Sequence, residues 1–125
     1  MNLNQVTLPA VDIGVSAAFY CGMGFTQIVD SPHYARFECP DGDVTFSVHH
    51  VDAVVPDSGV VVYFECADLD ARVTTLQSRG YRFDLLPTDQ RWLWREARLK
   101  DPSGTVLCLF QAGENRKNPP WRIKA

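Results

Sequence analysis

The hydrophobic and polar positions of the first half of the chain predict a strand, a helix and three further strands. Strand-like alternation changes to a helical spacing after Pro9, where Asp12 can cap a helix and Gly24 can end it in a left-handed conformation. The predicted elements are a strand at residues 3–8, a helix at 12–24, a strand at 25–29 and a hairpin at 34–49.

The second half repeats this order. Its predicted elements are a strand at 60–66, a helix at 68–80, a strand at 81–86 and a hairpin at 91–110. The interval from Asp12 to Gly24 equals that from Asp68 to Gly80, and an aromatic residue follows each glycine. Such self-similarity is typical of units that stack to bury a shared face. We therefore expect an α+β fold of two βαβββ modules. The alternative is an unrelated α+β sandwich whose matching caps are coincidental.

The repeat sets the expected domain organisation. Residues 1–112 form a single domain, with module one at 1–50, a linker at 51–59 and module two at 60–112. Residues 113–125 have no hydrophobic period and form an extended tail, in which Trp121 follows two prolines. We expect Trp121 to dock on its own domain or on a second subunit, with binding to another partner as the alternative.

Composition limits the classes of function. The 125 residues are 46% hydrophobic and 22% charged, as in ordinary globular proteins, and the formal net charge is −3. This charge gives no general attraction to nucleic acid or to an anionic membrane, and no apolar run is long enough to span a bilayer. The four cysteines include no C-x-x-C pair. We expect reduced structural thiols in a cytoplasmic protein.

Three motifs, taken in order, give the chain a family resemblance. They are the opening strand 3–8, Ala18-Phe19-Tyr20 followed by Gly24-Phe25, and Trp94-Arg95-Glu96 leading to Asp101-Pro102-Ser103-Gly104. Up to about residue 112 the chain resembles the vicinal oxygen chelate superfamily, which includes glyoxalases, bleomycin-resistance proteins and extradiol dioxygenases. The resemblance implies that each module curls its strands into half of a ligand-binding cup, and that the protein is a homodimer. It does not specify a reaction, because fold does not fix function.

In metal-dependent members of this family, four strand positions supply His, Gln and Glu ligands. Carrying these positions over gives Gln5 and Val61 on the first strands of the two modules and Cys108 on the last strand. The remaining position is Phe46 or Ser47, and we favour the register that directs Ser47 into the cup. Val61 has no donor atom and no carboxylate is present, so we expect the usual metal site to be lost and no cofactor to bind. The alternative is a divalent ion held by Gln5, His49 and Glu65.

Strand alternation selects the residues expected to face the ligand. Tyr63 and Glu65 share a strand face with the family's ligand position, and Arg95 shares one with Ala97, where family cups are lined. The predicted ligand-binding residues are Gln5, Ser47, Tyr63, Glu65, Trp92, Trp94 and Arg95. His49 and Glu65 are the predicted acid/base pair, with Arg95 holding an anionic group. The contrasting interpretation is an internal Glu65–Arg95 ion pair and a solvated His49.

Three functions follow from these expectations. The first is a metal-free protein that binds a small molecule without turning it over, and the second is a lyase, isomerase or dioxygenase with an altered site. The third is an interaction module whose cup is filled by its own side chains. The lost ligand positions and the tryptophan-rich hairpin favour the first.

Overall fold

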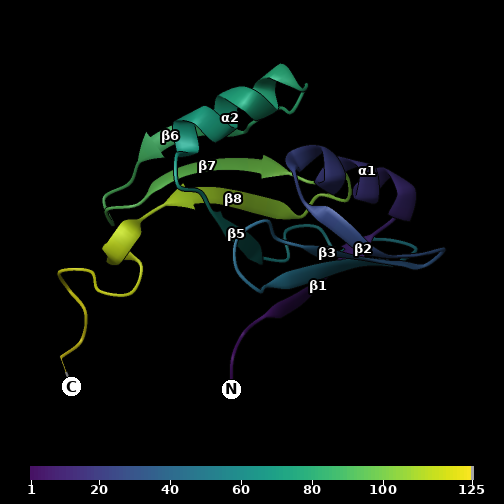
Figure 1. Cartoon of the computed structure of the whole chain (residues 1–125), viewed down its shortest axis with the longest axis horizontal. Helices are drawn as coiled ribbons and strands as arrows, with labels where there is room; N and C mark the ends of the chain where they lie inside the picture. The colour runs from purple at the N-terminus through teal and green to yellow at the C-terminus, as the bar shows by residue number, and fades with distance from the viewer. Residues whose placement is uncertain (125) are drawn as a thin grey trace. The chain divides into compact units, whose positions relative to one another are not determined.

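The computed structural model describes residues 1–124, which form two compact units (Figure 1). The first unit contains residues 1–60 together with the turn 101–105, and the second contains residues 61–100 and the described residues from 106 onward. The elements are β1 (Gln5–Ala10), α1 (Ile13–Met23), β2 (Thr26–Ser31), β3 (Tyr34–Glu38), β4 (Thr45–His50), β5 (Val61–Glu65), α2 (Leu69–Ser78), β6 (Leu85–Asp89), β7 (Arg95–Lys100), β8 (Val106–Gln111) and the 3-10 helix η1 (Gly113–Asn115).

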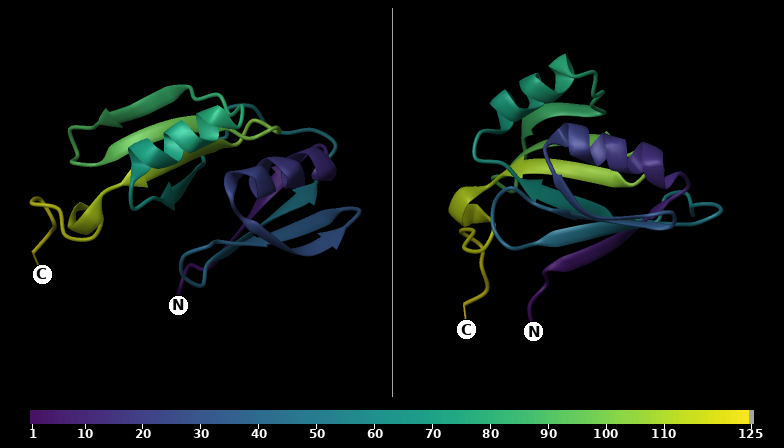
Figure 2. Two further views of the ribbon diagram at one scale, coloured as in Figure 1. Left: turned by 45° about the horizontal axis from the view of Figure 1, so that its top comes forward. Right: turned by 45° about the vertical axis from the view of Figure 1, so that its right-hand side comes forward.

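Each unit contains a four-stranded mixed sheet with one helix on one face (Figure 2). The strand orders are β1-β4-β3-β2 and β5-β8-β7-β6, with β1 parallel to β4, β5 parallel to β8 and the other pairs antiparallel. The predicted pair of βαβββ modules is therefore confirmed. Both helices begin as the sequence predicts, since Asp12 accepts a hydrogen bond from the Val15 amide and Asp68 accepts one from the Ala71 amide.

The core of the first unit lies between α1 and the sheet. Tyr20 on α1 is fully buried and its ring contacts Phe37 of β3 and Phe46 of β4, with ring centroids 5.6 and 4.9 Å away. In the second unit, Leu69, Val73 and Leu76 form the buried face of α2. Within residues 1–124, no helix combines the length and apolar character that a membrane crossing requires.

Several strands differ from their predicted bounds, and β1 and β6 do so for a clear physical cause. β1 continues through Pro9 instead of stopping before it, because β1 is an edge strand, where a residue without an amide hydrogen is tolerated. β6 begins at Leu85 and not at Tyr81. α2 ends at Ser78, and the Tyr81 amide donates to the Leu76 carbonyl in the cap that follows, so Tyr81 is held at the helix end and is not part of the strand.

The turn between β7 and β8 is held by side chains. The Tyr20 hydroxyl donates to Asp101 Oδ2 at 2.6 Å, while Asp101 Oδ1 accepts from the Ser103 and Thr105 amides at 2.9 Å each. Ser103 Oγ accepts from the Val11 amide at 3.0 Å. The Asp-Pro-Ser-Gly motif is therefore structural, because its carboxylate fixes both its own turn and the side chain of Tyr20.

Trp121 in the tail is 57% exposed, so of the two predicted docking modes the one on its own domain is not observed in the described part of the chain. Docking on a second subunit stays a prediction.

Candidate ligand-binding faces

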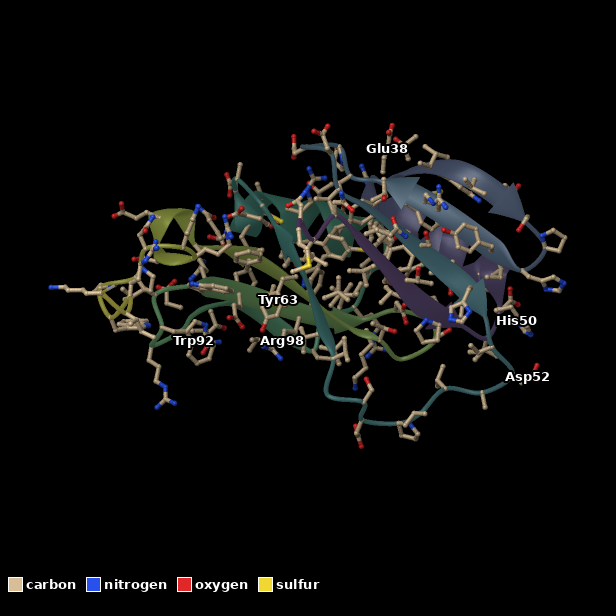
Figure 3. All side chains as sticks on the ribbon, turned by 90° about the horizontal axis from the view of Figure 1, so that it is seen from below. Glu38, His50, Asp52, Tyr63, Trp92 and Arg98 are labelled. Carbon is tan, nitrogen blue, oxygen red and sulfur yellow. The ribbon has the colours of Figure 1, made fainter. Side chains whose placement is uncertain are left out.

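Each sheet has one face covered by its helix and one that we call its helix-free face. In the second sheet, the strand register fixes which residues lie there. They are Val61, Tyr63 and Glu65 of β5, Glu96, Arg98 and Lys100 of β7, and Val106, Cys108 and Phe110 of β8. Figure 3, seen from below, shows Tyr63, Trp92 and Arg98 on this side, away from α2.

Aromatic rings form the apolar part of this face. Trp94 stacks on Phe110 with the ring centroids 4.7 Å apart, and Tyr63 meets both rings edge-on at 5.8 and 5.7 Å. The Trp94 indole N–H donates to the Asn115 carbonyl, which fixes the orientation of the ring. Tyr63 remains 44% exposed, so the cluster presents a rigid aromatic surface that a flat molecule can contact.

A buried carboxylate lies beside this cluster. Glu96 is 1% exposed, and its Oε2 accepts from the Trp92 indole N–H at 2.7 Å. Its Oε1 accepts from the Arg98 guanidinium at 3.3 Å, so both oxygens have partners. A buried carboxylate is stable only when it is paired and hydrogen-bonded in this way. The bond to Glu96 orients Trp92, whose 37% exposed ring can contact a ligand.

Cys108, in the middle of β8, is also fully buried on this face. Burial, and secondarily the negative charge of Glu96, raises the pKa of its thiol to about 12. The thiol therefore stays protonated at neutral pH, and a protonated thiol is a poor nucleophile. Its role is to pack against Phe110, Ala112 and Trp94.

The predicted position of Arg95 is wrong. Arg95 lies on the α2 side of the second sheet, where its guanidinium binds Asp70 of α2 and Asp89 of β6, each at 3.0 Å. The register of the hairpin, which pairs Arg98 with Cys108, puts Arg98 on the helix-free face instead. The Glu65–Arg95 ion pair is likewise absent from residues 1–124.

The helix-free face of the first sheet is polar. The Gln5 amide nitrogen donates to Ser47 Oγ at 2.7 Å, and the Gln5 amide oxygen accepts from the Thr45 hydroxyl. Ser47 is fully buried and its Oγ lies 2.5 Å from the Tyr34 hydroxyl. Ser47 therefore lies on the predicted face, and the alternative, Phe46, packs against Tyr20 on the α1 side.

The predicted acid/base residues have exposed side chains. His49 lies at the end of β4 opposite Tyr34, and Glu65 lies at the end of β5 opposite Phe110. Neither side chain makes a hydrogen bond or an ion pair with another of the residues 1–124. They belong to different units, and their pairing stays a prediction.

The residues at the family's metal positions do not fit a metal ion. Val61 has no donor atom, and both polar atoms of the Gln5 amide are bound within the protein. Among residues 1–124, no group of three or more His, Cys, Asp or Glu side chains is placed to hold a metal ion.

Sequence reasoning missed Glu96 and Arg98, although a usable signal existed. Cys108 lies at one of the family's ligand positions, and counting back through the hairpin from Cys108 leads to Arg98 as its antiparallel partner. Glu96 then follows on the same face by strand alternation. The error came from assigning Arg95 to the ligand face without using this pairing.

Comparison with known proteins gives a consistent result. Residues 2–109 match the family model described as the Glyoxalase/Bleomycin resistance protein/Dioxygenase superfamily. Among solved structures, a glyoxalase/bleomycin resistance protein/dioxygenase from Nocardioides is 23% identical with a TM-score of 0.78, covering 99% of this chain and 90% of that one. No curated protein sequence matches the chain.

Two of the similar structures are linked to bleomycin. A bleomycin-binding protein complexed with bleomycin is 25% identical with a TM-score of 0.74, covering 89% of this chain and 98% of that one. A bleomycin resistance determinant encoded on the transposon Tn5 is 24% identical with a TM-score of 0.77, covering 90% of this chain and 99% of that one.

Proposed function

This chain belongs to the glyoxalase/bleomycin resistance protein/dioxygenase superfamily, and we propose that it binds a small aromatic molecule without a metal ion. The helix-free face of the second sheet carries this proposal. Tyr63 and Trp92 are partly exposed there and are held in place by Trp94, Phe110 and Glu96. Pre-oriented aromatic side chains bind flat ligands with little loss of conformational entropy. The similarity to a bleomycin-binding protein gives general support to ligand binding by this fold.

Tryptophan fluorescence tests the proposal. The probes are bleomycin and a panel of planar heteroaromatic compounds such as indole and quinoline. We expect at least one probe to change the emission saturably in the wild type. Trp92→Phe should remove most of this change, and Tyr63→Ala should weaken binding by roughly tenfold, since contacts between aromatic rings contribute about 0.5–1.5 kcal/mol.

Trp121→Phe is the matched control, because Trp121 is an exposed tryptophan in the tail. This variant should keep the full saturable change. Failure of every probe to bind, or a response that follows Trp121 and not Trp92, would overturn the proposal.

Independence from metal is tested separately. Protein treated with a chelator should bind the same probe with unchanged affinity, because Val61 offers no donor atom and the Gln5 amide is already hydrogen-bonded at the family's ligand positions. Binding that requires added Zn²⁺, Mn²⁺ or Fe²⁺ would contradict this part of the proposal.

Catalysis by His49 and Glu65 is the alternative, and it is distinguishable from binding. Turnover of any bound probe that is lost in His49→Ala and Glu65→Gln, with binding retained, would favour an enzyme. We also propose a homodimer from the family resemblance. Sedimentation equilibrium measures the oligomeric state directly, and a monomer at all concentrations would exclude it.

A further inference from the structure

Arg36 on β3 is a half-buried guanidinium without a carboxylate partner among residues 1–124. Its Nε donates to the Tyr34 hydroxyl oxygen at 3.0 Å, and its Cζ atom lies 5.4 Å from the centre of the Tyr34 ring. The hydrogen-bond donors at the end of the guanidinium have no acceptor in the described chain. A partly buried cation in this condition gains from an anion supplied from outside.

The hydrogen bonds around Arg36 leave further donors unused. Ser47 Oγ accepts from Gln5, and the Tyr34 oxygen accepts from Arg36. The Tyr34 and Ser47 hydroxyls share one hydrogen bond, which uses only one of their two protons. When the buried Ser47 hydroxyl donates to the Tyr34 oxygen, the phenol keeps a proton without an acceptor in the described residues. These groups therefore leave donors without acceptors, which favours the binding of an anion, although Glu38 on the same strand face carries a negative charge.

The second module contains the same arrangement with its charge neutralised. Arg98 pairs with Cys108 as Arg36 pairs with Ser47, and each arginine follows its acceptor by two residues on the same strand face. The acceptor of Arg98 is the carboxylate of Glu96, whereas that of Arg36 is the uncharged phenol of Tyr34. The repeat thus provides an internal comparison in which only the first module lacks the counter-ion.

We propose that Arg36, with the Tyr34–Ser47 hydroxyl pair, forms a binding site for an oxyanion: the carboxylate, phosphate or sulfate group of a small molecule. The guanidinium supplies a planar pair of donors that matches two oxygens of such a group, and the free hydroxyl proton supplies a third hydrogen bond. This site belongs to the first unit and does not depend on the aromatic face of the second.

The acidity of Tyr34 is consistent with this site. The hydrogen bond to Ser47 is the main cause that lowers the pKa of the Tyr34 phenol, and the hydrogen bond and positive charge of Arg36 lower it further against the effect of burial. The Arg36 guanidinium, which helps to stabilise a negative charge on the phenol oxygen, is also the group that would contact a bound anion.

Backbone-amide NMR tests the site with inorganic phosphate, sulfate and acetate as probes at constant ionic strength. We expect saturable shifts of amide signals confined to β3 and β4. Arg36→Gln should weaken binding by about tenfold or more, as expected for the loss of charge-assisted hydrogen bonds. The comparison of phosphate and sulfate with acetate shows whether the site prefers a tetrahedral or a planar group.

Tyr34→Glu is the most informative variant, because position 34 is the first module's equivalent of Glu96. The substitution gives Arg36 a carboxylate counter-ion and leaves the guanidinium itself unchanged. We expect it to abolish anion binding, and Tyr34→Phe to weaken binding less. Arg72→Gln, which removes an exposed arginine of α2, is the control with the same charge change as Arg36→Gln and should bind like the wild type.

Three results would overturn the proposal. They are an absence of saturable shifts at millimolar anion, equal shifts in Arg36→Gln and Arg72→Gln, and undiminished binding by Tyr34→Glu. The amide spectrum of each variant also reports whether it is folded. Because the probes are simple anions and the signals come from the first module, failure of the aromatic-ligand proposal would leave this test unaffected.

Discussion

Replacing Tyr20 by phenylalanine removes one hydroxyl and keeps the aromatic ring. The hydroxyl donates to Asp101 Oδ2 at 2.6 Å, and Tyr20 and Asp101 are 0% and 4% exposed. The ring contacts with Phe37 and Phe46 would remain. Asp101 Oδ1 would keep its two amide donors, but Oδ2 would lose the partner that the structure gives it.

The expected cost follows from this geometry. A hydrogen bond to a charged group contributes about 1.5–3 kcal/mol, so Tyr20→Phe should lower the free energy of unfolding by about 2 kcal/mol. For a chain of this size, that corresponds to a decrease in Tm of roughly 6–10 °C. Urea unfolding followed by circular dichroism at neutral pH measures the change.

The control is Tyr63→Phe. The Tyr63 hydroxyl makes no hydrogen bond to another of the residues 1–124, and the residue is 44% exposed, so this variant should lie within about 0.5 kcal/mol of the wild type. If Tyr20→Phe is as stable as Tyr63→Phe, the Tyr20–Asp101 hydrogen bond does not stabilise the fold and our account of the turn is wrong.

Three further predictions can be tested with the same preparations. Burial and the neighbouring Asp101 carboxylate raise the pKa of Tyr20 above its ordinary value of 10.0. The stability that comes from its neutral phenol is therefore complete below about pH 10 and decreases by about 1.4 kcal/mol per pH unit above it. Tyr20→Phe should lack this component in urea unfolding at alkaline pH. A thiol reagent followed by mass spectrometry should modify the exposed Cys21 in the folded protein and the buried Cys108, whose pKa is about 12, only after unfolding. Asp12→Ala should cost about 1 kcal/mol in urea unfolding, because the Val15 amide loses its cap.

The fold was predictable because its signals are local and occur twice. Capping aspartates, helix-ending glycines and hairpin turns each fix a short segment, and the repeat confirmed each assignment with a second copy. Strand boundaries were less predictable, since Pro9 and Tyr81 depend on which strand lies at an edge and on how a helix closes. The edge position of a strand and the closing of a helix end depend on neighbouring elements, which a local sequence pattern does not contain.

The candidate sites were predicted only in part because their chemistry depends on pairs of residues. Strand alternation predicts the correct sheet face for Tyr63 and Ser47. It predicts the wrong face for Arg95, because the residue pairing between the two strands of the hairpin was not used. The importance of Glu96 depends on two donors, and no single position in the sequence shows that both reach it.

The two modules show how one backbone plan can support two kinds of surface. At positions that the strand register makes equivalent, Gln5 and Ser47 of the first module correspond to Val61 and Cys108 of the second. The first pair joins a hydrogen-bonded network, whereas the second pair belongs to an apolar cluster under aromatic rings. Neither module keeps a set of metal donors at these positions, yet each keeps an arginine on the adjacent strand. The different environments of Arg36 and Arg98 therefore follow from the acceptor two residues before each, a phenol in one case and a carboxylate in the other. The residue at this one position therefore decides whether the arginine of a module has a counter-ion within the described chain.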